Sequence, residues 1–158
     1  MCEYCGCQSL ASIDELTREH DEVVRLISHL RSAHQGADVA RMAEVARRIS
    51  TVLAPHTRVE EHGLFPALAP DFPEQIAALE AEHRHVEAVL AECADDVTPS
   101  DPSWPDRLMA AMAVLREHIL KEQDGVFPAA LATLGTEDWE AVEEVRARAG
   151  GALPGRAA

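Results

Sequence analysis

Two histidines interrupt the apolar stripes of candidate helices. His20 stands between Leu16 and Val23, where the 3-4 alternation of apolar residues would place another apolar side chain. His83 occupies the matching gap in a later stripe. An imidazole turned into a helical core needs a hydrogen-bond partner or a metal ion, because burying an unpaired polar group costs several kcal/mol. A single such histidine is ordinarily a satisfied core residue, so the interpretation rests on the full set of interruptions.

Two His–Glu pairs interrupt two further stripes. His56 and Glu60 stand four residues apart in one stripe, and His118 and Glu122 do so in the other. Residues at i and i+4 share one face of a helix, with Cβ atoms roughly 5–6 Å apart. Each pair therefore points an imidazole and a carboxylate in one direction, which the apolar neighbours mark as the interior.

The interrupted stripes form an internal repeat. His83 follows His20 by 63 residues, and His118 follows His56 by 62. The two glutamates, and the Phe-Pro dipeptides that follow them, are offset by the same 62 residues. A helix pair that occurs twice predicts a bundle with approximate two-fold symmetry, which would place the matching side chains around one shared axis.

Two metal cations would make six buried ionisable groups tolerable. The cations would neutralise the carboxylates and accept the lone pairs of the imidazoles. Imidazole together with carboxylate suits iron, manganese or zinc, and two carboxylates shared between two ions suit a bridged pair. A His–Glu hydrogen-bond network without metal is the alternative interpretation, and it would make a costly core.

The spacing of apolar residues predicts an all-α protein. Ala, Leu, Val, Glu and Arg are plentiful and aromatic residues make up only 4% of the chain, which favours helix over sheet. Connections are short, so neighbouring helices should run antiparallel. We expect an up-down-up-down antiparallel four-helix bundle with a short extra C-terminal helix. The predicted helices span residues 12–33, 38–68, 73–94, 104–134 and 137–149.

Local signals set the predicted helix ends. Ser12 with Glu15 forms a capping box that would start the first helix. Pro55 lies inside the second helix and predicts a kink or a change of helical direction nearby. Thr136 is the expected cap of the last helix.

The chain divides into three parts by this reasoning. Residues 12–134 form the bundle, residues 135–158 a short helix and tail, and residues 1–11 an N-terminal tail. That tail could bind a metal, act as a redox sensor or be only mobile, and its three cysteines are too few for a closed tetrahedral site. They are Cys2, Cys5 and Cys7.

Charge and hydropathy narrow the partners. The formal net charge of −14 argues against nucleic acid or an anionic membrane surface, since both attract basic faces. No stretch approaches the ~20 apolar residues of a membrane span. The first ten residues lack the basic start and apolar run of a signal peptide, so a cytoplasmic location is expected.

These residues make the chain resemble the hemerythrin-like family of HHE cation-binding domains. That family has a His on the first helix, His-x-x-x-Glu on the second, a His on the third, and a His with a carboxylate on the fourth. The resemblance covers about residues 13–131. It implies a non-haem di-iron centre of the Fe–O–Fe type, in which Glu60 and Glu122 bridge the ions and the four histidines are terminal ligands. Zinc and manganese are the alternative metals.

Two positions depart from the oxygen-carrying members of the family. Those members have a His four residues beyond the third-helix ligand and an Asp five beyond the fourth-helix His, where this chain has Glu87 and Gln123. Glu87 is either a replacement ligand or a solvated helix residue. A site richer in carboxylate should favour ferric iron, which favours sensing or turnover over simple oxygen carriage.

Three functions fit this set of ligands. The first is a di-iron protein that binds or senses oxygen, peroxide, nitric oxide or the iron and redox state. The second is an enzyme that disproportionates peroxide in the manner of a catalase, or reduces nitric oxide. The third is a storage or structural bundle.

The sequence also places several residues outside the ligand set. Cys93 should be a small core residue, and Phe65 and Phe127 should pack near the site. Four further histidines should lie on the surface: His29, His34, His62 and His85.

Overall fold

The computed structural model describes residues 6–154, and every regular element within that range is helical. No helix in this range is long and apolar enough to cross a membrane. In chain order the elements are α1 (Cys7–Gln35), α2 (Val39–Val59), η1 (Glu60–Leu64), α3 (Phe65–Leu68), α4 (Pro73–Ala91), α5 (Trp104–Lys121), η2 (Glu122–Val126), α6 (Phe127–Thr133) and α7 (Thr136–Ala149).

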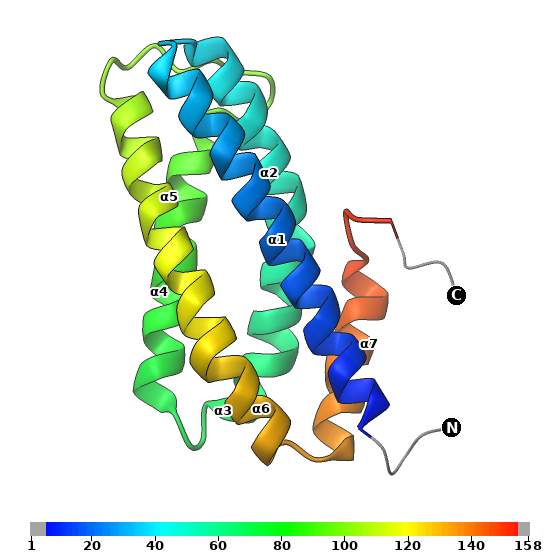
Figure 1. The fold of residues 1–158 in the computed structure, drawn as a ribbon. Helices are drawn as coiled ribbons and strands as arrows, with labels where there is room; N and C mark the ends of the chain where they lie inside the picture. The colour runs from blue at the N-terminus through cyan, green and yellow to red at the C-terminus, as the bar shows by residue number, and fades with distance from the viewer. Residues whose placement is uncertain (1–5, 155–158) are drawn as a thin grey trace.

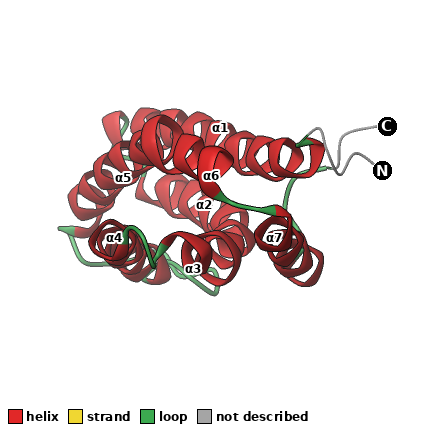
Figure 2. Cartoon of the chain, turned by 90° about the horizontal axis from the view of Figure 1, so that it is seen from below, coloured by secondary structure: helices red, strands yellow, loops and turns green. Residues whose placement is uncertain are grey.

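The helices form the predicted up-down-up-down bundle (Figure 1). α1 packs along α2, and α4 packs along α5, so the two halves of the sequence repeat form the two halves of the bundle. Seen along the bundle, the four long helices surround a shared interior, and α7 lies outside that ring (Figure 2). α7 runs back beside α1, α2 and η1, whereas the second half of the bundle has no such cover among the described residues.

Two helix starts differ from the sequence prediction. α1 begins at Cys7 after Gly6, whose φ of 65° lies in the left-handed region, so Ser12 is inside the helix and caps nothing. No Gly or Pro separates Gly6 from Ser12, and the helix therefore extends through part of the predicted tail. Cys2 and Cys5 lie outside the described residues. α7 begins at Thr136, with Gly135 as its N-cap.

A widened helical turn follows each of the repeated glutamates. α2 stays α-helical through Pro55, and the departure from α geometry comes at η1, a π-helix that starts at Glu60. η2 is the equivalent π-helix and starts at Glu122. In both, the amide of the residue before a proline donates to the glutamate carbonyl five residues back. A proline ring clashes with the carbonyl four residues earlier in an α-helix, and a π turn displaces that carbonyl.

The apolar core falls into two clusters along the bundle axis. One cluster includes Val23 and Val86, and the other includes Leu16 and Leu79. His20 and His83 lie between these pairs on their helices, so the layer of ionisable groups separates the two clusters. Apolar side chains therefore enclose that layer from both ends of the bundle.

Candidate metal centre

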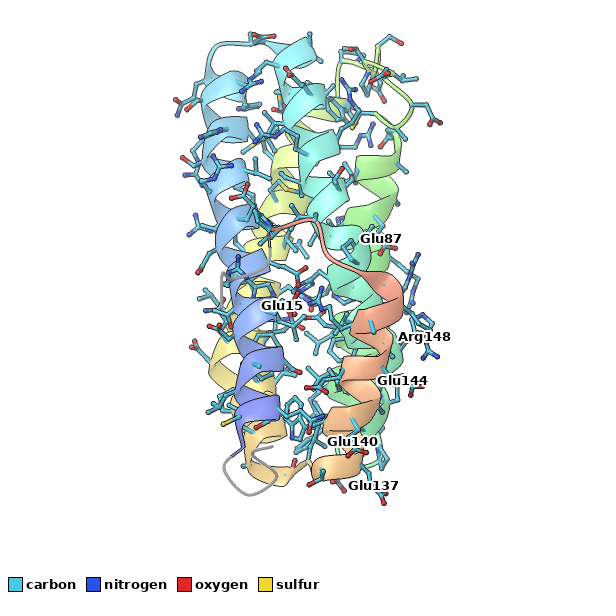
Figure 3. All side chains as sticks on the ribbon, turned by 90° about the vertical axis from the view of Figure 1, so that its right-hand side faces the viewer. Glu15, Glu87, Glu137, Glu140, Glu144 and Arg148 are labelled. Atoms are coloured by element: carbon cyan, nitrogen blue, oxygen red, sulfur yellow. The ribbon has the colours of Figure 1, made fainter. Side chains whose placement is uncertain are left out.

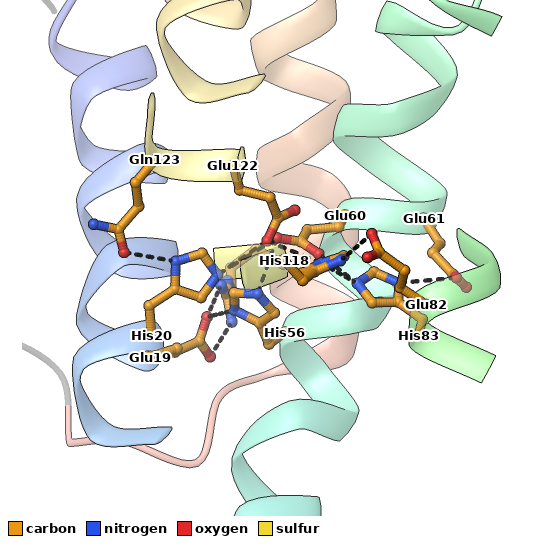
Figure 4. A network of polar contacts seen from close by, with 11 residues as sticks. Glu19, His20, His56, Glu60, Glu61, Glu82, His83, His118, Glu122 and Gln123 are labelled. Carbon is orange, nitrogen blue, oxygen red and sulfur yellow. Dashed lines mark hydrogen bonds and ion pairs between the residues drawn. The ribbon is translucent and has the colours of Figure 1, made fainter. Parts of the chain in front are cut away.

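Four histidines and two glutamates meet in the layer between the apolar clusters (Figure 4). Their ligand atoms form two groups, and within each group these atoms lie within 4.8 Å of one another. The first group pairs His20 and His56 with both glutamates, and the second pairs His83 and His118 with the same two glutamates. Glu60 and Glu122 thus belong to both groups, and each has an exposed fraction of 0%.

All four histidines turn Nε2 toward this layer. In the first half, His20 Nε2 lies 3.1 Å from Glu122 Oε1 and His56 Nε2 lies 2.9 Å from Glu60 Oε1. In the second half, His118 Nε2 is 3.2 Å from Glu122 Oε1. His83 Nε2 is 3.2 Å from Glu60 Oε2. The Nε2 atoms of the two histidines in the second half are only 3.0 Å apart, so two nitrogens address the same small space.

The other ring nitrogen of each histidine meets an oxygen that can only accept a hydrogen bond. Because that oxygen has no hydrogen to give, Nδ1 must carry one, which leaves Nε2 available to a metal. The four Nδ1 atoms and their acceptors lie 3.1–3.3 Å apart. They are His20 with Gln123, His56 with Glu19, His83 with Glu61, and His118 with Glu82.

Two of these acceptors are in turn held by a cation. Arg146 on α7 donates two hydrogen bonds to the Glu19 carboxylate, at 2.7 and 3.0 Å. Lys121 on α5 donates to Glu82 at 2.8 and 3.0 Å. The two-fold relation therefore extends outward from the ligands to their acceptors, but the cation comes from different elements in the two halves.

The carboxylates carry buried oxygens that protein hydrogen bonds do not satisfy. Both oxygens of Glu60 and Oε2 of Glu122 have no hydrogen-bond partner, although imidazole nitrogens stand close to Glu60. An unsatisfied buried oxygen costs about 1–3 kcal/mol, and more when it is charged. A cation among these atoms would remove that cost, and imidazole with carboxylate is a donor set that iron, manganese and zinc accept. The residues present therefore fit a pair of metal ions.

The same carboxylates raise the pKa of His56 and His83. Burial disfavours a charged imidazole at His56, but Glu60 and Glu19 outweigh burial and raise its pKa to about 10. At His83 burial is likewise outweighed, mainly by Glu60, and the pKa rises to about 9. Burial would raise the pKa of Glu60, yet His56 and His83 hold it well below its usual value. Metal-free protein thus carries imidazolium–carboxylate pairs in place of the cations.

Two phenylalanines close the site toward one apolar cluster. Phe127 stacks on the His20 ring, with centroids 5.4 Å apart and planes 10° from parallel. Phe65 stacks on His83 in the same way, at 5.7 Å and 10°. Both phenylalanines are buried, as the sequence predicted, and they fix the ring planes while excluding water.

The structure places Glu87 apart from the other predicted ligands. Its side chain is exposed on α4 and belongs to neither group of ligand atoms (Figure 3). It sits one turn beyond His83, on a helix whose buried face is set by Val86 and Leu90, so it points to solvent. Of the two interpretations offered for Glu87, its exposed position favours the solvated helix residue.

The other sequence predictions for single residues have clear outcomes. Cys93 is fully buried, which confirms it as a core residue. His29, His62 and His85 are exposed, as predicted. His34 is half-buried and lies 2.8 Å from an Asp106 oxygen, so it is a surface residue with a partner.

Sequence reasoning did not identify the outer hydrogen-bond acceptors. Each of them is next to a predicted ligand in the sequence. Glu19 and Glu82 come directly before His20 and His83, and Glu61 and Gln123 come directly after Glu60 and Glu122. These positions also repeat at offsets of 62 and 63 residues, so the internal repeat contained the signal. Arg146 lies outside the repeat, and no pattern in the sequence indicated it.

Fold and site together define a helical-bundle domain that offers His and Glu ligands to metal cations. The model of the hemerythrin HHE cation-binding domain family matches residues 11–130, about three quarters of the chain. The chain therefore belongs to this family. No curated protein and no solved structure gives a significant match.

Proposed function

We propose that this chain holds two iron ions between its helices and uses them to bind or sense oxygen, peroxide, nitric oxide or the iron and redox state. The observation that carries the proposal is the sharing of Glu60 and Glu122 by both groups of ligand atoms. Two carboxylates common to two sites suit a bridged pair better than two separate ions. Bound iron would supply redox chemistry and an open coordination position for a small ligand.

The side chains around the site orient the imidazole rings and exclude water. Four Nδ1–H donors fix the imidazole rings, which keeps each Nε2 directed inward. Phe65 and Phe127 cover two of the rings and exclude water. A buried site of this kind would admit a small, weakly polar ligand more readily than a large anionic substrate.

The ligand set supports sensing over reversible oxygen carriage. The exposed position of Glu87 leaves two imidazoles and two shared carboxylates to each ion, with no fifth histidine. Such a carboxylate-rich set should favour ferric iron. The ionisable neighbours in the described part of the chain are engaged as Nδ1 acceptors, so none of them faces the pair as a proton donor. This supports ligand binding over catalytic turnover. A cytoplasmic location, expected from the sequence, is part of the same proposal.

Iron content and the absorption spectrum test this proposal. Protein reconstituted with ferrous iron under argon should retain two irons per chain, and its absorption spectrum should change when oxygen or nitric oxide is added. Glu60→Gln should lose the iron pair, whereas Glu87→Gln, a matched control on an exposed helix position, should retain it. Sustained oxygen release from peroxide would instead support the enzyme, and a preference for zinc would support the structural role. Wild-type protein that does not retain two irons per chain would refute the proposal.

A further inference from the structure

The two halves of the centre are symmetric in their ligands but not in their surroundings. We call the half with His20 and His56 the covered half, because α7 packs beside it. The half with His83 and His118 is the open half. If the centre holds the proposed pair of metal ions, this asymmetry determines how firmly the protein holds each of them.

α7 packs closely on the covered half. Its buried stripe of Trp139, Val142 and Val145 joins the apolar cluster next to the site. A Cβ added to Gly63 would lie only 3.2 Å from the Val142 Cα, so the two backbones approach as near as a glycine permits. The outward face of α7 is acidic, with Glu137, Glu140 and Glu144 exposed (Figure 3).

The equivalent face of the open half has no helix on it. Gly125 matches Gly63 in the repeat, and a Cβ added there would meet nothing within 4 Å. An open, mainly apolar groove of about 600 Å³ lies at this place, lined among others by Leu68, Ile76 and Val126. The two faces are related by the repeat, and among the described residues only the first is covered by α7.

The carboxylates that accept hydrogen bonds from His56 and His118, and the cations that pair with them, also differ in solvent exposure. On the covered side, Glu19 is 1% exposed and receives a two-pronged pair from Arg146, whose side chain is 15% exposed. On the open side, the Glu82 and Lys121 side chains are 21% and 54% exposed. Solvent screens exposed pairs strongly, and a planar guanidinium fixes a carboxylate better than a mobile ammonium.

We propose that Arg146 is a positioning residue of the metal centre: acting through Glu19, it holds His56 and makes the covered half retain its ion more firmly than the open half. α7 lies beyond residues 11–130, which match the family model, so this support comes from outside the matched domain. Partners that orient a metal-bound histidine typically change metal affinity by 10–100-fold when they are removed. The open half is then the one whose ion exchanges first.

Release of ferrous iron to a chelator tests this inference. Protein loaded with two ferrous ions under argon should release them in two phases of equal amplitude. Arg146→Gln should accelerate only the slow phase, by about 10–100-fold. Lys121→Gln is the matched control on the open half and should leave the slow phase unchanged. Arg146→Lys should restore part of the slow phase, because a lysine can still pair with Glu19.

Folding is checked separately, by circular dichroism of each metal-free variant. If Arg146→Gln does not fold, Glu19→Gln serves as the second variant. It removes the charge that attracts Arg146 but keeps an oxygen for His56, so it breaks the same pair at the other residue. A single release phase in wild-type protein would overturn the inference. Equal acceleration of both phases by Arg146→Gln and by Lys121→Gln would also overturn it. Failure to load two ions would instead refute the proposed function, which distinguishes the two failures.

Discussion

Metal binding should release protons, because two of the ligand histidines, His56 and His83, are charged at neutral pH in the metal-free protein. The pKa of His56 is raised to about 10 and that of His83 to about 9. At pH 7 each is therefore protonated in about 99% or more of the molecules. A metal ion needs a neutral imidazole, so both protons must leave on binding. Glu60 adds none, since its pKa is well below the usual value.

The expected release is about two protons per chain at pH 7. The affinity for the pair of ions should then rise roughly 100-fold per pH unit between pH 7 and 8, and level off above pH 10. Calorimetric titration with ferrous iron under argon, repeated in buffers of different ionisation enthalpy, gives the proton count directly. His118 also has a raised pKa and should add a further fraction.

Two variants sharpen this measurement. Glu61→Gln keeps an oxygen for His83 Nδ1 but removes the negative charge that helps to raise the pKa of His83, so fewer protons should be released near pH 9. His85→Gln changes an exposed histidine and should leave the count as in wild type. A release below one proton per chain at pH 7 would refute the reasoning, because the buried imidazoles would then be neutral before the metal arrives.

Three further predictions concern stability. Gly63→Leu should lower the free energy of unfolding by about 1–3 kcal/mol, because the new side chain pushes α7 away. Gly125→Leu places its side chain in open space, so it should leave that free energy unchanged or raise it by up to about 1 kcal/mol. Urea unfolding of the two variants compares these effects. Trp139→Ala should cost about 3–5 kcal/mol in the same assay. The raised pKa values of His56 and His83 contribute stability to metal-free protein that is complete below about pH 6.5, and thermal melts should show this contribution being lost as pH rises through about 9 and 10.

The inner layer of the site could be predicted from the sequence because it obeys helical periodicity. A histidine or a His–Glu pair in an otherwise apolar stripe has only one direction to point once the helix packs. The repeat then supplied the relation between helices, which a single stripe cannot give. Glu87 shows the limit of this reasoning: resemblance suggested it, while its own helix face, set by Val86 and Leu90, turns it to solvent.

Other features depend on tertiary structure and could not be predicted in this way. The π turns at Glu60 and Glu122 change the helical register by one residue, and the sequence shows only a proline six positions on. Arg146 reaches Glu19 across 127 residues, and only the docking of α7 brings them together. The early start of α1 at Cys7 reflects the competition between a capping box and continued helix, which local patterns do not decide.

The most direct test of the account is anomalous diffraction at the iron edge from crystals of iron-loaded protein. Two iron peaks are expected, one beside His20 and His56 and one beside His83 and His118, with both glutamates between them. A single peak, or peaks away from Glu60 and Glu122, would contradict it.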